Sequence, residues 1–312
     1  MAALQNPGSG TREPGVGPAN VRGTLKRDEP MARHTSWRVG GPADRYFEPA
    51  DRADLLAFAR RLPPDEPVLW LGLGSNLLVR DGGFRGTVIA LHGALGGLSR
   101  DSETTLYAEA GVHCARLAKF AQQQRLAGLG FMAGIPGTVG GALAMNAGAF
   151  GGETWPVVRE VEVLFRDGAT AWLDAGHFGV AYRHVIPPPG FLGFLAARFR
   201  VAPDEDGEAS RTRAALARRK ATQPVGRPSA GSTFRNPPGE HAARLIEAAG
   251  LKGARVGGAT VSTLHANFIL TEAGATAADV EALIETIRRT VKERTGVELE
   301  PEVRIVGEPA HA

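Results

Sequence analysis

The chain has 312 residues, 43% of them hydrophobic and 22% charged, and a formal net charge of +3. This size and composition are typical of a globular protein with two or three domains, and the small positive charge favours an anionic small ligand over nucleic acid. The one cysteine, Cys114, excludes an internal disulfide and fits a reducing cytoplasm.

Residues 1–30 are rich in glycine and proline and contain few large apolar side chains. They cannot bury enough surface to fold, so we predict a disordered tail, and they lack the apolar segment of a signal peptide. The uncharged stretch 126–152 contains nine glycines and Pro136, which predicts loops against a ligand and argues against a membrane helix. We therefore expect a cytoplasmic monomer without membrane or nucleic-acid partners.

The region from Thr35 to about Val201 is mostly strand-like and punctuated by glycine. Its predicted strands are 68–71, 87–91, 106–110, 157–165 and 195–201. Two helices interrupt the strands, because apolar residues recur on one face of 52–62 and 113–125.

The acidic stretch 204–207 predicts a linker, and the chain beyond it has an α/β pattern. A helix over 242–249 is predicted to stop at Gly250. The clearest helix runs over 276–294, since Thr276 and Asp279 approximate a capping box and Gly296 ends it. Residues 303–306 predict a final short strand.

The first candidate motif is a glycine-rich loop after the strand 68–71, namely Gly72-Leu73-Gly74-Ser75-Asn76-Leu77. A leucine stands where a dinucleotide fingerprint has its third glycine, and 77–79 predicts a strand, which excludes a Rossmann site. Backbone N–H groups of such a loop can bind phosphate, with Ser75 and Asn76 as further donors. A plain β-turn is the alternative interpretation.

The second candidate motif is the segment 134–148, which lacks the lysine of a P-loop. Its glycines permit close approach of a planar or anionic ligand, and Thr138 and Asn146 offer hydrogen bonds. A glycine-rich packing crossover is the alternative.

Together the two glycine segments resemble the FAD-binding domain of the vanillyl-alcohol-oxidase-like flavoproteins. Within that group, the string GIPGTVGGALAMNAGAFGGE over 134–153 and the string TSWRVGGPA over 35–43 are similar to the UDP-N-acetylenolpyruvoylglucosamine reductase family. The resemblance covers about residues 33–307. It implies an α+β fold in which two lobes, 31–95 and 96–201, clasp FAD, and a C-terminal α/β domain, 202–312, binds substrate.

The resemblance also implies the activity and the cofactors. Enzymes of this family reduce UDP-N-acetylglucosamine enolpyruvate to UDP-N-acetylmuramate with NADPH through bound FAD, in peptidoglycan precursor synthesis. The residues that this assigns to FAD are Gly72, Gly74, Ser75, Asn76, Leu77, Gly134, Ile135, Pro136, Gly137, Thr138, Gly140, Gly141, Asn146 and Gly148.

Three catalytic residues follow from the same resemblance. Ser232, in the loop 228–237, corresponds to the proton donor, Glu302 to the catalytic glutamate and Arg183 to its partner arginine. A serine in a turn, a charged strand entry and a surface arginine are the ordinary alternatives. The implied chemistry suits the residue types, because an arginine fork and a neutral carboxyl can stabilise a developing enolate that a hydroxyl then protonates.

The substrate contacts that the resemblance implies are Tyr182, Lys220, Arg235, Asn236 and His265. The chain departs from the family pattern at three positions. Thr222 stands where the family has the lysine that precedes Gln-Pro, and Val185 and Thr271 are the other two departures. No tyrosine lies between Arg183 and Ser232, so the chain resembles the shorter subclass, which lacks a tyrosine-bearing loop. Another flavoenzyme, such as a 2-hydroxy-acid oxidase, and a non-catalytic nucleotide-binding module are the alternatives.

Overall fold

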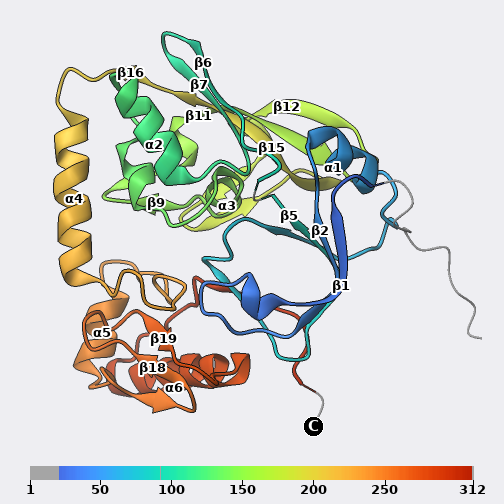
Figure 1. The fold of residues 1–312 in the computed structure, drawn as a ribbon. Coiled ribbons are helices and arrows are strands. Elements are labelled where there is room, and N and C mark those ends of the chain that lie inside the picture. Colours follow the sequence, from blue (N-terminus) through green and yellow to red (C-terminus); the bar gives the residue numbers. More distant parts are fainter. Residues whose placement is uncertain (1–20, 92, 311–312) are drawn as a thin grey trace, which may run out of the picture.

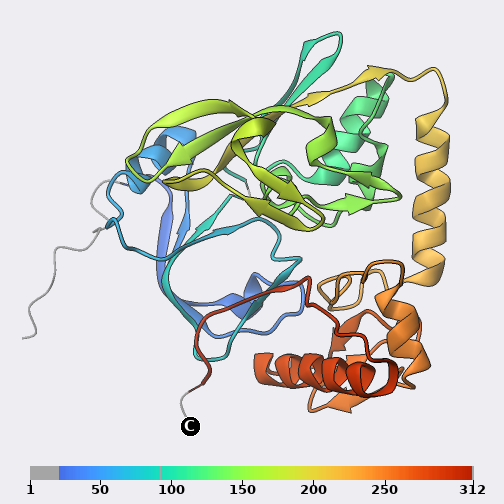
Figure 2. The same ribbon diagram turned by 180° about the vertical axis from the view of Figure 1, so that it is seen from behind.

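A computed structural model describes residues 21–91 and 93–310. It consists of two sheet-based lobes above a C-terminal region, with one long helix, α4, along the edge that joins them (Figure 1). The view from behind shows the same arrangement, with the C-terminal segment running back from the lower region to the first lobe (Figure 2). The lobes and the C-terminal region confirm the expected α+β fold of an FAD-binding domain followed by a C-terminal domain.

The first lobe is built on a four-stranded sheet in the order β1-β2-β5-β3. Its strands are β1 (Thr24–Pro30), β2 (Pro42–Glu48), β5 (Phe84–Ala90) and β3 (Val68–Leu71). β1 is antiparallel to β2, whereas β2 and β3 are both parallel to β5. The helix α1 (Arg52–Ala59) begins at Asp51, whose side chain accepts a hydrogen bond from the backbone N–H of Asp54.

The structure contradicts the predicted tail over residues 21–30. β1 pairs with β2 along its length, and the buried Asp54 carboxylate accepts hydrogen bonds from the backbone N–H groups of Arg22 and Gly23. The apolar content of this segment is low, but its backbone groups satisfy a strand edge and a buried carboxylate. The remainder of the predicted tail, residues 1–20, lies outside the described residues.

The second lobe is a five-stranded antiparallel sheet in the order β12-β11-β15-β7-β6. Its strands are β12 (Thr170–Asp174), β11 (Val158–Phe165), β15 (Phe191–Arg200), β7 (Thr105–Glu109) and β6 (Leu98–Ser102). The helices α2 (Cys114–Gln123) and α3 (Val139–Met145) belong to this lobe. Cys114 is fully buried in this lobe.

The C-terminal region begins with α4 (Glu208–Thr222) and packs α5 (Ala242–Ala248) and α6 (Ala277–Thr295) with a small sheet. That sheet contains β17 (Arg255–Val256), β18 (Ala259–Val261) and β19 (Ile269–Thr271). The last strand, β20 (Arg304–Val306), leaves this region and pairs in parallel with β4 (Leu77–Val79) of the first lobe. The segment just before β20 therefore lies beside the first glycine loop.

Most predicted elements are confirmed within a few residues, and α6 has the predicted capping box and the left-handed Gly296. The sequence missed α4 as a helix. No residue of α4 is buried, so it lacks the apolar stripe by which a helix is found in sequence. The predicted linker at 204–207 instead leads directly into α4, because the Asp204 carboxylate accepts from the backbone N–H of Glu208.

Candidate active site

One cavity of about 800 Å³ lies where the two lobes meet the C-terminal region. This is within the range of small-molecule sites, about 300 to 1,000 Å³. Both glycine segments line it, together with Tyr182 and Arg183, the end of α4, the loop 230–236, and Glu302. Among the described residues, no group of three His, Cys, Asp or Glu side chains gathers as a metal site, and no helix combines the length and apolarity that a membrane crossing needs.

The first glycine loop packs tightly on its neighbours because two of its residues have no side chain. A Cβ on Gly74 would lie 2.0 Å from the carbonyl oxygen of His34, and one on Gly72 would lie 2.4 Å from the Thr138 hydroxyl. Gly74 also has a φ of 61°, which a side chain disfavours. The loop is thus held against the second glycine segment, with Ser75 and Asn76 lining the cavity.

The second glycine segment divides into residues that face the cavity and residues that face the protein. At Gly137 and Gly141 an added Cβ would meet nothing closer than 3.5 Å and 3.8 Å, and both residues line the cavity. A Cβ on Gly140 would lie 3.0 Å from that of Ala110, and Gly140 donates its N–H to the Ala110 carbonyl at 2.8 Å. The open faces of Gly137 and Gly141 fit a flat cofactor, which could lie in contact with their backbone atoms because no side chain intervenes.

Two residues assigned to the cofactor do not line the cavity. Gly140 packs against Ala110, the residue that follows β7, and its assignment to FAD stays a prediction. Asn146 is buried, and its side chain is used within the protein: its amide nitrogen donates to Glu153 and to the Ala181 carbonyl, and its oxygen accepts from the Trp155 N–H. The sequence identified its hydrogen-bonding capacity but not the partners that use it.

The other assigned cofactor residues line the cavity as expected. They are Gly72, Gly74, Ser75, Asn76, Leu77, Gly134, Ile135, Pro136, Gly137, Thr138, Gly141 and Gly148. Among them Asn76 connects distant parts of the site, since its side-chain nitrogen donates to the backbone carbonyl of Glu302 at 3.0 Å. The first glycine loop and the segment with the predicted catalytic glutamate are therefore joined by a hydrogen bond.

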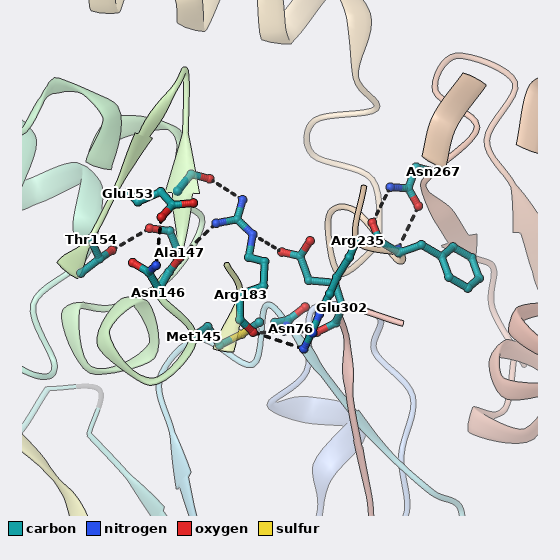
Figure 3. A network of polar contacts seen from close by, with 12 residues as sticks. Asn76, Met145, Asn146, Ala147, Glu153, Thr154, Arg183, Arg235, Asn267 and Glu302 are labelled. Atoms are coloured by element: carbon teal, nitrogen blue, oxygen red, sulfur yellow. Dashed lines mark hydrogen bonds and ion pairs between the residues drawn. The ribbon is translucent and has the colours of Figure 1, made fainter. Parts of the chain in front are cut away.

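Arg183 and Glu302 face each other in the cavity (Figure 3). Arg183 lies in the turn between β13 (Gly179–Ala181) and β14 (His184–Ile186), with a φ of 54°. Its two terminal nitrogens donate to the carbonyls of Asn146 and Gly148, and its Nε lies 2.9 Å from Oε1 of Glu302. That Nε is buried and its N–H does not align with an acceptor, so the contact is an ion pair by distance only.

The surroundings of the Glu302 carboxyl shift its pKa upward. Burial raises its pKa, although the guanidinium groups of Arg183 and Arg235 act in the opposite direction. Burial is the largest of these influences, because only a small part of the Glu302 side chain, 16%, is exposed. A neutral carboxyl beside a fixed arginine can donate a hydrogen bond to an anionic oxygen.

Ser232 lies in the same cavity, on a loop tied to the Glu302 segment. The backbone N–H of Glu302 donates to the Thr233 carbonyl at 2.8 Å, and Phe234 forms a bridge with Pro301. The buried Asn267 holds the loop from the other side, accepting from the Phe234 N–H and donating to its carbonyl. Three predicted catalytic residues from three distant segments are thus brought together.

The predicted substrate residues separate into two groups. Tyr182 and Asn236 line the cavity. Lys220 is exposed, and neither it nor Arg235 nor His265 lines the cavity, so their contacts with substrate stay predictions. Arg235 instead donates to the Arg183 carbonyl, and the His265 ring packs on Phe268 with its pKa lowered by burial.

Sequence analysis missed several cavity residues, notably Trp70, Phe150, Arg218, Arg219 and Arg304. Arg218 and Arg219 replace Lys220 as the cations that α4 presents to the cavity. Their signal in the sequence is the basic run Arg218-Arg219-Lys220, but the run alone does not show which of its side chains faces the cavity. Phe150 lies within the family-like string 134–153, and in the sequence it looks like an ordinary packing residue. Only its positive φ in the structure sets it apart.

The fold and the glycine-lined cavity define an FAD-binding oxidoreductase. A family model described as FAD binding domain matches residues 43–174, and one described as UDP-N-acetylenolpyruvoylglucosamine reductase, C-terminal domain, matches residues 223–306. The chain is 59% identical to the UDP-N-acetylenolpyruvoylglucosamine reductase of Alkalilimnicola ehrlichii, covering 92% of this chain and 96% of that one. It is 57% identical to that of Methylococcus capsulatus, covering 93% and 95%.

A solved structure gives the same result. The UDP-N-acetylenolpyruvylglucosamine reductase from Thermus caldophilus matches with a TM-score of 0.74 and 35% identity, over 92% of this chain and 99% of that chain. The chain belongs to the UDP-N-acetylenolpyruvoylglucosamine reductase family.

Proposed function

We propose that this chain reduces UDP-N-acetylglucosamine enolpyruvate to UDP-N-acetylmuramate with NADPH and FAD, and that Arg183, Glu302 and Ser232 carry the proton-transfer part. The activity is that of its family, whose products enter peptidoglycan precursor synthesis. The observation that supports the residue roles is a buried carboxyl with a raised pKa, 2.9 Å from an arginine, in the cavity that Ser232 also lines.

The cofactor would be held by the cavity faces of the two glycine segments. Gly137 and Gly141 leave room for its flat ring, and the loop 72–76 offers backbone N–H groups to its phosphates. Bound FAD, reduced by NADPH, supplies the hydride for the terminal methylene carbon of the substrate. Side chains of this protein would bind the substrate carboxylate and donate the proton.

Arg183 and Glu302 would bind the substrate carboxylate, where negative charge accumulates as hydride is added. The guanidinium is fixed by two backbone carbonyls, so no reorganisation is needed when the charge develops. Glu302 helps in its protonated form, by donating a hydrogen bond, whereas an ionised carboxylate would repel the same charge. Its burial therefore favours the state that the reaction requires.

Ser232 would donate its hydroxyl proton to the carbon next to the one that receives hydride. A hydroxyl is a weak acid, but the enolate is a strong base, so the pair is matched. The loop that carries Ser232 is bonded to both Glu302 and Asn267, which fixes the direction of delivery. Solvent restores the serine proton after turnover.

Residues around the catalytic groups would also contact the substrate. Tyr182 and Asn236 would contact the substrate in the cavity, and Arg235 would act on it through Arg183. The protein would work in the cytoplasm as a monomer. Its three regions would divide near residues 95 and 201, with β20 returning to the first lobe.

The proposed activity is tested with purified protein, NADPH and UDP-N-acetylglucosamine enolpyruvate. The protein should show the visible absorption of bound flavin, and NADPH oxidation should require the enolpyruvyl substrate. A flavin-free protein, or one that oxidises a 2-hydroxy acid and ignores the enolpyruvyl ether, would refute the proposal.

A further inference from the structure

Arg183 lies at the tip of a hairpin, β13 and β14, whose residues all remain accessible to solvent. Every residue over 179–186 is exposed or half-buried, and of these Val185 packs on the main hydrophobic core. A two-stranded hairpin is only marginally stable by itself. The position of the Arg183 guanidinium therefore depends on polar contacts between the tip of the hairpin and the rest of the protein.

Asn146 contacts this tip at two points. Its side-chain nitrogen donates to the carbonyl of Ala181 at 3.1 Å, which holds the strand two residues before the arginine. Its backbone carbonyl accepts from the Arg183 guanidinium, also at 3.1 Å. One residue therefore holds both the main chain that enters the turn and the head of the arginine side chain (Figure 3).

The backbone of Asn146 suits this double contact. Asn146 ends α3 with a φ of 45°, in the left-handed conformation that asparagine tolerates better than most other side chains do. Its N–H still bonds to carbonyls of α3, whereas its own carbonyl lies past the end of the helix and is free to accept from Arg183. The end of α3 is thus the support on which the arginine rests.

Glu153 fixes the orientation of the Asn146 amide. The side-chain nitrogen of the buried Asn146 also donates to Oε2 of Glu153 at 3.0 Å, and its side-chain oxygen accepts from the Trp155 N–H at 3.1 Å. A flip of the amide would turn its oxygen toward two acceptors and its nitrogen toward a donor, so all three hydrogen bonds would be lost. The Glu153 carboxylate therefore helps to keep the nitrogen directed at Ala181.

We propose that Asn146 is a positioning residue for Arg183, and that Glu153 holds the Asn146 amide in the orientation that this role needs. Neither Asn146 nor Glu153 lines the cavity, so both act on the reaction through the arginine. The inference rests on the proposed function, in which Arg183 binds the substrate carboxylate. A guanidinium held in this way is already in place when negative charge develops on that carboxylate.

The test measures the two half-reactions of the FAD-loaded protein separately by stopped-flow absorbance. Asn146→Asp keeps the size of the side chain and its tolerance of a positive φ, but it places an oxygen where the nitrogen donates to two acceptors. Reoxidation of the flavin by UDP-N-acetylglucosamine enolpyruvate should slow by about 100-fold, the effect of displacing a substrate-binding group by about 1 Å. Reduction of FAD by NADPH and the FAD content should be unchanged.

Two variants of Glu153 and a matched control accompany this change. Glu153→Ala should slow reoxidation by about tenfold, because one hydrogen bond to a charged acceptor is lost, and Glu153→Gln, whose oxygen still accepts, should restore the wild-type rate. Thr154→Val is the control, since it removes another buried hydrogen bond of the same segment, the one to the Ala147 carbonyl. It should lower the Tm and leave both half-reactions at the wild-type rate.

Arg183→Ala provides the background that separates positioning from general stability. If Asn146 acts through the arginine, Asn146→Asp should slow reoxidation by less than about twofold further once Arg183 is alanine, whereas independent effects would multiply in full. Glu153→Ala gives the same comparison if Asn146→Asp does not fold.

Wild-type reoxidation in both Asn146→Asp and Glu153→Ala would overturn the inference, and so would effects that multiply in full with Arg183→Ala. Loss of FAD from Asn146→Asp, with FAD retained in Thr154→Val, would also overturn it by assigning Asn146 to the cofactor. Failure of the proposed function would appear differently, as a wild-type protein that does not reduce the enolpyruvyl substrate or an Arg183→Ala variant that reoxidises at the wild-type rate.

Discussion

The region of the cavity that contains Arg183, Glu302 and Ser232, which we call the fixed end, differs from the region of Phe150 and Arg219 in how its side chains are held. Arg183 and Glu302 are mostly buried, and the segments that carry them are tied together by backbone hydrogen bonds. Phe150, by contrast, lies in a turn with a positive φ, and Arg219 donates to a single backbone carbonyl, that of Gly134. Under the proposed roles, Arg183 and Glu302 are therefore fixed before substrate arrives and need no reorganisation when charge develops.

The largest expected effect is at the fixed end. Ser232→Ala should slow reoxidation of the reduced flavin by enolpyruvyl substrate by about 100- to 10,000-fold, because only water remains as the acid. Reduction of FAD by NADPH should be nearly unchanged, since it needs no proton from Ser232. Stopped-flow absorbance measures each half-reaction separately, and Ser232→Cys, which keeps a donor, should retain more activity than Ala.

Reoxidation of Ser232→Ala at the wild-type rate would show that Ser232 is only a turn residue. The account of the fixed end would then lose its proton donor, while the roles of Arg183 and Glu302 would still be open to test.

The next effect separates two adjacent glycines. Gly141→Leu should give a folded protein that has lost FAD, because the side chain would enter the cavity. Gly140→Leu should instead lower the Tm, since its side chain would collide with Ala110. Flavin content and thermal unfolding of both variants check this, and stoichiometric FAD in folded Gly141→Leu would contradict the placement of the cofactor.

A smaller effect tests the corrected tail boundary. A chain that starts at residue 31 should have a Tm about 5 °C or more below one that starts at residue 21, because β1 is lost and the buried Asp54 loses two donors. Equal Tm values for the two chains would show that β1 adds nothing to stability.

The sequence predicted elements and loops wherever one strong local pattern was enough. The capping box of α6 and the glycine loops are such patterns. α4 was missed because it buries no residue, and β1 because its stability comes from pairing and from Asp54, about 30 residues away. Gly140 and Gly141 look alike in sequence, and only the position of Ala110 beside Gly140 distinguishes their surroundings.

The candidate site followed the same rule. The resemblance located Arg183, Ser232 and Glu302, which the fold brings to one cavity. It did not show that Lys220 faces away from the cavity while Arg219 faces it, because a side chain's direction on a helix depends on how the helix packs. Nor did it show the strain at Phe150, which is a backbone property.

The most direct test of the fixed end is the pH dependence of the substrate half-reaction in the wild type and in Glu302→Gln. Burial raises the pKa of Glu302, so the active acid form should persist above the usual glutamic acid range, and the rate should fall as pH rises through the raised pKa. Glu302→Gln, which donates at every pH, should be slower at low pH but should lose this fall. A wild-type rate that instead rises with pH through this range, or a fall that persists in Glu302→Gln, would contradict a protonated Glu302.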